Sequence, residues 1–213
     1  MKSPEGRIQS LVEAGKVSTE EGDRLVRALG TGGSGASRFL DPFERHGGGA
    51  AAAAGLALVA LGTLTSFARV RFDGFLDMHV VHGDVAYRTA IVDGAVAWIL
   101  PALVFFAAAK VIRAHGRLLD FLGVAGLSRA PLVLAALPLA ALVRGIDLGG
   151  ARGGFAAVVL AVVALAAVAW NLTWLYRGFK NATGARGTKL VVTFAVALVV
   201  AETLTKIVLA RLV

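Results

Sequence analysis

Residues 89–109 read TAIVDGAVAWILPALVFFAAA, and Asp93 is the single charged side chain among them. A helix needs about 20 apolar residues to cross the hydrocarbon core of a bilayer, and this stretch supplies them. Four more apolar stretches cover residues 49–68, 130–143, 154–176 and 190–210. The sequence therefore predicts an all-α fold, a polytopic membrane bundle with five transmembrane helices.

The third apolar stretch, residues 130–143, is the shortest of the five. At 1.5 Å per residue it gives only about 21 Å of helix, less than the thickness of the bilayer core. It spans if the membrane thins locally or if Phe121–Leu127 extends it upstream. Because the stretch contains Pro131 and Pro138, a kinked or partly re-entrant segment is an alternative. If this stretch does not span, every later segment changes sides.

The composition excludes several classes of protein. Of the 213 residues, 57% are hydrophobic and 17% are charged, and the mean hydropathy is +0.73. Soluble domains average about 25% charged residues, so a water-soluble globule is excluded. The high hydrophobicity also excludes a disordered chain. Cysteine is absent, which excludes disulfides, thiolate zinc sites and cysteine nucleophiles.

The net charge of +8 comes from the connections between the apolar stretches. Residues 1–48 hold seven basic and seven acidic side chains, so no nucleic-acid-binding region is predicted. If the N-terminus lies inside, the polar segments on the inner side of the membrane hold 15 Lys and Arg residues in total, and those on the outer side hold six. Lys206 lies within the last apolar stretch and is counted on neither side. The positive-inside rule then predicts a protein integral to the cytoplasmic (inner) membrane, with a cytoplasmic N-terminus and an external C-terminus.

The polar N-terminal region is predicted to form a cytoplasmic helical hairpin, residues 1–30. Ser18 and Glu21 have the spacing of a capping box at the start of its second helix. The apolar faces expected to close on each other comprise Ile8, Leu11 and Val12 in the first helix and Leu25, Val26 and Leu29 in the second. Residues 31–48 are predicted to be a Gly/Ser linker with a juxtamembrane segment, and residues 49–213 the membrane domain.

The stretch RIQSLVEAGKVSTEEGDRLVRAL, residues 7–29, resembles the short helical hairpins found at the ends of bacterial membrane and regulatory proteins. These share apolar residues followed by E-x-G-K-[IV], then S/T-x-E-E, then an apolar tail. The resemblance implies a soluble interaction module without catalytic activity, and hence a possible protein partner at the hairpin.

Three charged residues inside the spans form a candidate polar intramembrane site: Asp93, Glu202 and Lys206. A charge at the centre of a span costs roughly 2.5–3.5 kcal/mol. Glu202 and Lys206 are spaced i, i+4, so they meet on one helix face. This pair either neutralises itself, with Lys206 reaching the interface, or forms a site for an ion, a proton or a lipid headgroup.

The predicted topology brings the charges Arg144, Asp147 and Arg152 of an external loop toward the same leaflet as that candidate site. An outward-facing polar cavity is one hypothesis for this collection. The alternative is that each charge lies at headgroup depth and is simply hydrated.

Residues 110–127 read as an amphipathic interfacial helix on the cytoplasmic side. Lys110, Arg113 and Arg117 would then contact anionic headgroups. The alternative is a plain connector.

The first external loop contains His79, His82 and flanking aspartates, residue types that bind metals, but Gly74 and Gly83 flank them and no helix is indicated. We interpret this segment as a solvated loop and expect no metal site.

A second resemblance covers residues 48–213. It comprises GRLLDFLGVAGLSRAPLVLAALP at 116–138, WNLT at 170–173, RGFKNATG at 177–184 and the basic ARGTK at 185–189, which leads into the last span. Together these resemble the Yip family (Ypt-interacting-protein domain), especially its bacterial members. The charged pair in the last span and the long first external loop depart from the family pattern.

The resemblance to the Yip family implies a five-span helical bundle with a cytoplasmic N-terminus and no catalytic residues. Eukaryotic relatives act in vesicle traffic with small GTPases of the Rab class, but the helical hairpin here differs from their N-terminal tails, so that partner is not carried over.

The expected function is that of a non-enzymatic membrane scaffold or organiser with a docking hairpin. It has no cofactor, and its partners are the lipid bilayer and a possible protein at the hairpin. The alternative is a small permease or channel using Asp93, Glu202 and Lys206. A lipid-modifying enzyme is set aside, because no nucleophile and base occur together and no nucleotide-binding or hydrolase motif is present.

Overall fold

The chain has two compact units, residues 1–40 and 41–213, which are described separately. The structure, a computed structural model, describes residues 4–30, 41–44, 48–72, 74, 76–81, 84–145 and 151–212. The predicted Gly/Ser linker at 31–37 lies outside the described residues.

The first unit contains the predicted helical hairpin, with α1 at Pro4–Glu13 and α2 at Thr19–Gly30. The two helices meet at Gly22, where an added Cβ would lie 2.5 Å from Val12 Cγ2. The face of α2 that closes on α1 is therefore set by Gly22. Leu25, which the pattern places on that face, is 45% exposed. Leu11 is also exposed, at 39%.

The predicted capping box at the start of α2 is confirmed. The Ser18 backbone N–H donates to Glu21 Oε2 at 3.1 Å, and the Ser18 hydroxyl donates to the same oxygen at 2.9 Å. In return, the Glu21 N–H donates to Ser18 Oγ at 3.2 Å. The backbone hydrogen bond, followed by that of the hydroxyl, lowers the pKa of Glu21 below its ordinary value.

The capping box predicts a pH dependence at the start of α2. A carboxylate whose pKa is lowered on folding stabilises the fold above its unfolded pKa, about 4.3, and that contribution is lost as the pH falls through the lower folded value. We expect amide hydrogen exchange in residues 18–22, relative to intrinsic rates, to accelerate below about pH 4. Glu21→Gln should lack this step. The same pH profile in both proteins would contradict the assignment.

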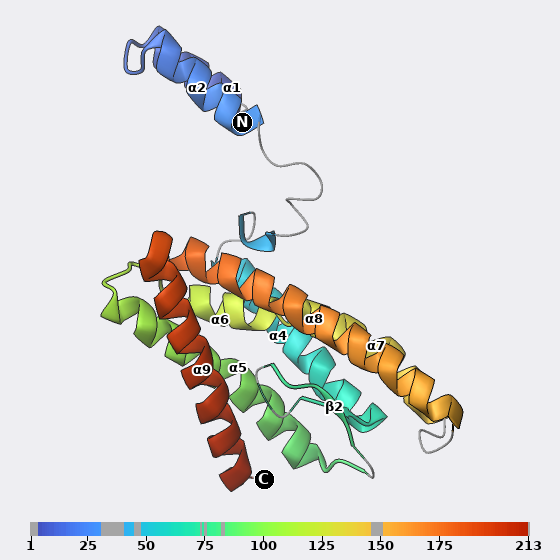
Figure 1. Ribbon diagram of the computed structural model, residues 1–213. Helices are drawn as coiled ribbons and strands as arrows, with labels where there is room; N and C mark the ends of the chain where they lie inside the picture. Colours follow the sequence, from blue (N-terminus) through green and yellow to red (C-terminus); the bar gives the residue numbers. More distant parts are fainter. Residues whose placement is uncertain are drawn as a thin grey trace. The chain divides into compact units, whose positions relative to one another are not determined.

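The second unit is a helical bundle with one small β-hairpin (Figure 1). Its elements are η1 (Pro42–Glu44), α4 (Gly48–Thr65), η2 (Ser66–Ala68), β1 (Val70–Arg71), β2 (His79–Val80), α5 (Tyr87–Val111), α6 (Leu118–Leu127), α7 (Ala130–Gly145), α8 (Ala151–Thr183) and α9 (Gly187–Leu212). Within the described residues, five helical segments are long and apolar enough to cross a membrane: 48–68, 87–111, 118–140, 158–183 and 187–212.

The third of these segments joins two helices, α6 and α7, across Ser128 and Arg129. The upstream extension that residues 130–143 required is therefore present. Pro131 lies in the first turn of α7, where a missing N–H costs nothing, while Pro138 lies inside the helix. The segment forms the most enclosed of the five crossings.

The interfacial helix predicted over residues 110–127 is wrong. α5 continues to Val111, and Arg113 then turns the chain through a left-handed conformation with φ 58°. The carboxylate of Asp120 accepts the Arg117 N–H at 2.8 Å and starts α6. Phe121 and Ala125 of α6 are fully buried, because this helix packs inside the bundle against α4, α5 and α8.

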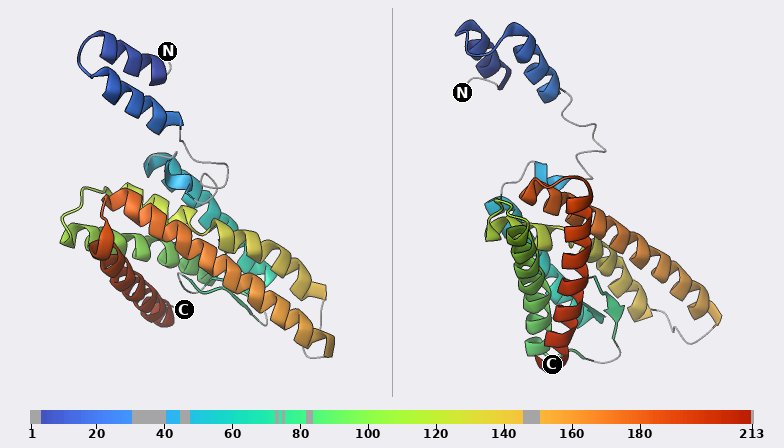
Figure 2. Two further views of the ribbon diagram at one scale, coloured as in Figure 1. Left: turned by 45° about the horizontal axis from the view of Figure 1, so that its top comes forward. Right: turned by 60° about the vertical axis from the view of Figure 1, so that its left-hand side comes forward.

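Two apolar clusters hold the bundle together. Phe105, Phe121, Phe179 and Phe194 bring α5, α6, α8 and α9 into one aromatic core, with ring centroids 5.5–6.0 Å apart. The second cluster joins α7 and α8 with Val70 and Phe72 of the β1 region. Figures 1 and 2 show the result: α9 lies beside α5, and α8 runs along α7.

The connections gather at two ends of the bundle. One end, here called the basic end, holds the start of α4, the α5–α6 connection and the α8–α9 connection. The cationic residues described there include Lys110, Arg113, Arg117, Arg177, Lys180, Arg186 and Lys189. The other end, called the β-hairpin end, holds β1 and β2, the start of α5 and the last turns of α9.

Candidate functional site

The first loop of the membrane unit folds into the bundle as a β-hairpin, residues 69–81. Its strands pair antiparallel, with Val70 opposite Val80 and Arg71 opposite His79. Val70 is fully buried and Phe72 is 5% exposed, because both pack on α7. Within the segment interpreted as a solvated loop, residues 77–81 are half-buried, and His79 and Val80 form β2. His82 lies outside the described residues, and no group of metal-binding side chains occurs in the part of the chain that is described.

Asp93 is bound by the β-hairpin. Arg71 donates from Nε to Asp93 Oδ2 at 2.6 Å and from Nη2 to Oδ1 at 3.2 Å, a bidentate pair. The Asp93 side chain is 1% exposed and that of Arg71 21%. Asp93 is thus a buried, paired charge and not a hydrated one at headgroup depth. Such a pair keeps its geometry because two parallel hydrogen bonds fix both side chains.

Glu202 and Lys206 meet on α9, as their spacing predicted, with Lys206 Nζ 3.7 Å from Glu202 Oε1. Each also binds the β-hairpin. Glu202 accepts the Leu76 N–H at 3.1 Å, and Lys206 donates to Asp77 Oδ2 at 2.7 Å. Lys206 is half exposed and Asp77 39% exposed, so this side of the network reaches the surface.

Arg129 is a further member of the network that sequence reasoning missed. The count of 15 basic residues on the inner side includes Arg129, but the structure buries it to 4% exposure between α6 and α7. Its Nη2 donates to the Gly74 carbonyl at 3.0 Å, and its guanidinium lies 5.8 Å from the centre of the Phe72 ring. Glu202 attracts it electrostatically. Without Arg129 the inner segments still hold 14 basic residues against six.

Gly74 lies where these side chains converge. An added Cβ would lie 2.9 Å from Glu202 Oε1 and 2.9 Å from Asp77 Cβ, so no larger residue fits without a shift. The space that remains beside Asp93 and Arg129 measures only about 10 Å³, roughly the volume needed for one water molecule.

Among the residues that the structure describes, the network brings together three cations and three anions: Arg71, Arg129, Lys206, Asp77, Asp93 and Glu202. This network fastens the β-hairpin to α5, to α9 and to the α6–α7 junction through the charged residues of the spans.

Three loop charges were assigned to a hypothetical outward-facing cavity. Asp147 lies outside the described residues, and so do the side chains of Arg144 and Arg152.

The three predicted headgroup residues lie at the basic end but face different surroundings. Lys110 donates to the Gly116 carbonyl at 3.3 Å and lies 5.0 Å from the centre of the Phe106 ring. Arg113 is exposed in the α5–α6 turn, and Arg117 lies at the start of α6. Their contact with lipid stays a prediction.

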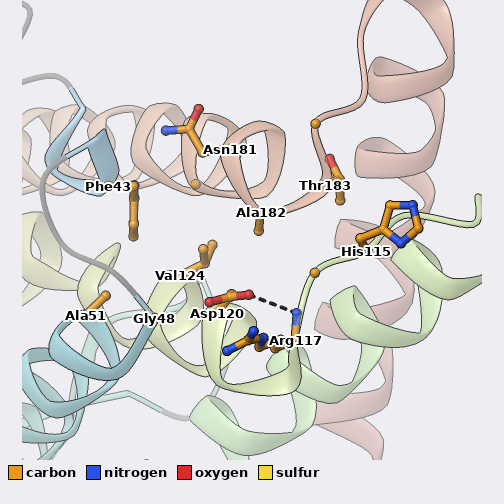
Figure 3. Close-up of a pocket in the computed structure, with 13 residues that line it drawn as sticks. Phe43, Gly48, Ala51, His115, Arg117, Asp120, Val124, Asn181, Ala182 and Thr183 are labelled. Carbon is orange, nitrogen blue, oxygen red and sulfur yellow. Dashed lines mark hydrogen bonds between the residues drawn. The ribbon is translucent and has the colours of Figure 1, made fainter. Parts of the chain in front are cut away.

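A cavity of about 460 Å³ also opens at the basic end, between the α5–α6 connection and the end of α8 (Figure 3). Asp120 lies in the middle of its lining, with His115 and Thr183 to one side and Phe43 and Asn181 to the other. Asn181 Nδ2 bridges both oxygens of Asp41 at 3.1 and 3.2 Å, which anchors the segment before α4 to α8. The carboxylate of Asp120 in this lining disfavours a simple anion site here.

The comparison with protein families decides the classification of the bundle. A family model described as the Yip1 domain matches residues 39–209. The chain belongs to the Yip1 domain family. It is therefore an integral membrane protein, and the resemblance seen in the sequence is confirmed for the membrane unit. The helical hairpin precedes the residues matched to the Yip1 domain. No curated protein and no solved structure matches the chain.

Proposed function

We propose that this Yip1-domain protein is a non-enzymatic membrane scaffold of the cytoplasmic membrane. The bundle holds the chain in the bilayer with its basic end toward the cytoplasm, and the helical hairpin binds a protein partner there. The excess of basic residues at the basic end supports this orientation.

One observation carries the proposal: the charged residues of the spans are occupied in fastening the β-hairpin. A transport pathway needs polar groups that face a water-filled passage. Asp93 is instead enclosed with Arg71, and Glu202 holds the backbone of Leu76. The space of about 10 Å³ beside Asp93 is far below that of a hydrated ion.

The helical hairpin supplies a surface for a partner. Leu11 and Leu25 are exposed apolar side chains in a unit that is otherwise rich in charge. An exposed apolar side chain on a helix is the usual anchor when a helix docks into a groove of another protein. The hairpin resemblance points to the same kind of interaction.

A site-specific photo-crosslinker tests the docking surface in the full-length protein in native membranes. Placed at Leu25, it should give a discrete protein adduct, and Gly22→Val should abolish that adduct because the added side chain forces α2 away from Val12. Gln9, which is exposed and polar, is the matched control position and should give none. Equal labelling from Leu25 and Gln9 would contradict a docking role.

Reconstituted liposomes test the transport alternative. We expect ion or solute flux to equal that of empty liposomes, and Glu202→Ala to leave it unchanged. Flux that depends on Glu202 would overturn the scaffold proposal in favour of a permease or channel.

A further inference from the structure

An apolar groove of about 500 Å³ runs along the outer surface between α5 and α9. Eleven side chains line it, and all but Thr193 are apolar. From Val192 to Leu204 the groove follows α9 for about 18 Å, at 1.5 Å per residue. One leaflet of the hydrocarbon core is about 15 Å deep, so the groove has the length of a single leaflet.

Two cations mark one mouth of this groove, at the basic end. Lys189 Nζ donates to the Ile112 carbonyl at 3.2 Å, and Ile112 itself lines the groove. The Lys189 ammonium is therefore held at the mouth, with two further N–H donors for another acceptor. Arg113 follows Ile112 directly and is exposed in the left-handed turn that ends α5.

The start of α9 adds to the positive potential at this mouth. α9 begins at Gly187, two residues before Lys189, so the positive end of its helix dipole lies beside the ammonium. Lys110, by contrast, turns toward Gly116 and the Phe106 ring and does not line the groove. The cationic mouth is thus set by Arg113 and Lys189 together with the helix start.

We propose that this groove binds one anionic phospholipid of the leaflet at the basic end. An acyl chain lies along α5 and α9, and the phosphate sits between Arg113 and Lys189. The occupant is a lipid because the apolar lining of the groove is about as long as one leaflet is deep. The two cations lie at the mouth of the groove, where the phosphate of such a lipid would lie. The assignment goes beyond the scaffold proposal and is independent of the helical hairpin.

Native mass spectrometry of the full-length protein in detergent tests the assignment with phosphatidylglycerol, phosphatidylcholine and soluble glycerol phosphate as separate probes. We expect one phosphatidylglycerol to be retained, phosphatidylcholine to be lost readily, and glycerol phosphate not to bind, because it has no acyl chain. Arg113→Gln with Lys189→Gln should lower phosphatidylglycerol occupancy at least about tenfold, the loss expected for two charge-assisted hydrogen bonds.

Two further variants separate this site from a general charge effect. Lys110→Gln with Lys180→Gln removes the same charge from the same end and should leave occupancy unchanged. Ala107→Trp fills the groove from an exposed position and should expel the lipid while both cations remain. If this variant does not fold, as judged by circular dichroism and gel filtration, the smaller Ala107→Leu takes its place.

The results that would overturn the proposal are distinct. Equal retention of phosphatidylcholine would show a groove without headgroup selection. Binding of glycerol phosphate would indicate a soluble phosphate site. An equal loss in the Lys110 and Lys180 variant would show that only the overall charge matters, and unchanged occupancy in the groove-filling variants would place the lipid elsewhere.

Discussion

Gly126→Val is expected to destabilise the bundle by at least about 3 kcal/mol, the upper part of the range for overpacked sites. A Cβ at Gly126 would lie 2.6 Å from the Cα of Gly55 and 2.8 Å from Trp98 Nε1. The first contact is with the backbone of α4, which cannot rotate away as a side chain would. α4 and α6 must therefore separate, and the Trp98 hydrogen bond to the Leu122 carbonyl, 2.9 Å long, is expected to break with them.

Unfolding by a denaturing detergent, followed by tryptophan fluorescence, measures this effect. Gly49→Val is the matched control, because it makes the same substitution in α4 where a Cβ would meet nothing closer than Leu119 Cδ2 at 3.9 Å. The control should lose well under 1 kcal/mol, as expected for a substitution away from close packing. Similar losses in both variants would show that the two helices do not depend on this close approach.

The five spans could be predicted from the sequence because membrane insertion depends on a local property, the apolar length of each segment. Residues 89–109 suffice by themselves to predict a crossing. The requirement that residues 130–143 be extended upstream also followed from length alone, and α6 supplies the extension. The contact between Gly55 and Gly126 could not be predicted, because it depends on which two helices become neighbours.

Arg129 shows where the sequence argument failed. Taken with residues 130–143 alone, it flanks an apolar stretch and counts as a loop residue. Taken with the 23-residue segment 118–140, it lies in the middle of a span and signals a buried charge. The charges within residues 110–127 favoured a helix at the membrane surface. The burial of α6, and with it that of Arg129, was therefore not predicted.

For the candidate polar site, the charged residues of the spans could be predicted from the sequence, but their partners could not. The cost of a charge in a span identified Asp93, Glu202 and Lys206 from composition. Their partners lie on the β-hairpin, 22 residues from Asp93 and 126 to 129 residues from the α9 pair. No periodicity links positions so far apart.

Asp93→Ala is expected to cost about 3 kcal/mol, the lower part of the range for removing one partner of a buried ion pair. The loss leaves Arg71 without its bidentate acceptor, while its 21% exposure allows some rehydration. The β-hairpin should loosen, because Arg71 lies in β1. Hydrogen exchange in residues 69–81 is therefore expected to accelerate together with the loss of unfolding free energy.

A double-mutant cycle separates the pair from other effects of the substitution. Arg71→Met combined with Asp93→Ala should recover much of the loss, because both members of the buried pair are then removed together. Lys206→Met is the matched single variant at the exposed side of the network and should cost under about 1 kcal/mol, since Lys206 and Asp77 are 50% and 39% exposed. If Asp93→Ala costs no more than Lys206→Met, or if the double variant is the least stable of all, then Asp93 does not hold the β-hairpin through Arg71. The intramembrane charges would then need a role other than fastening it.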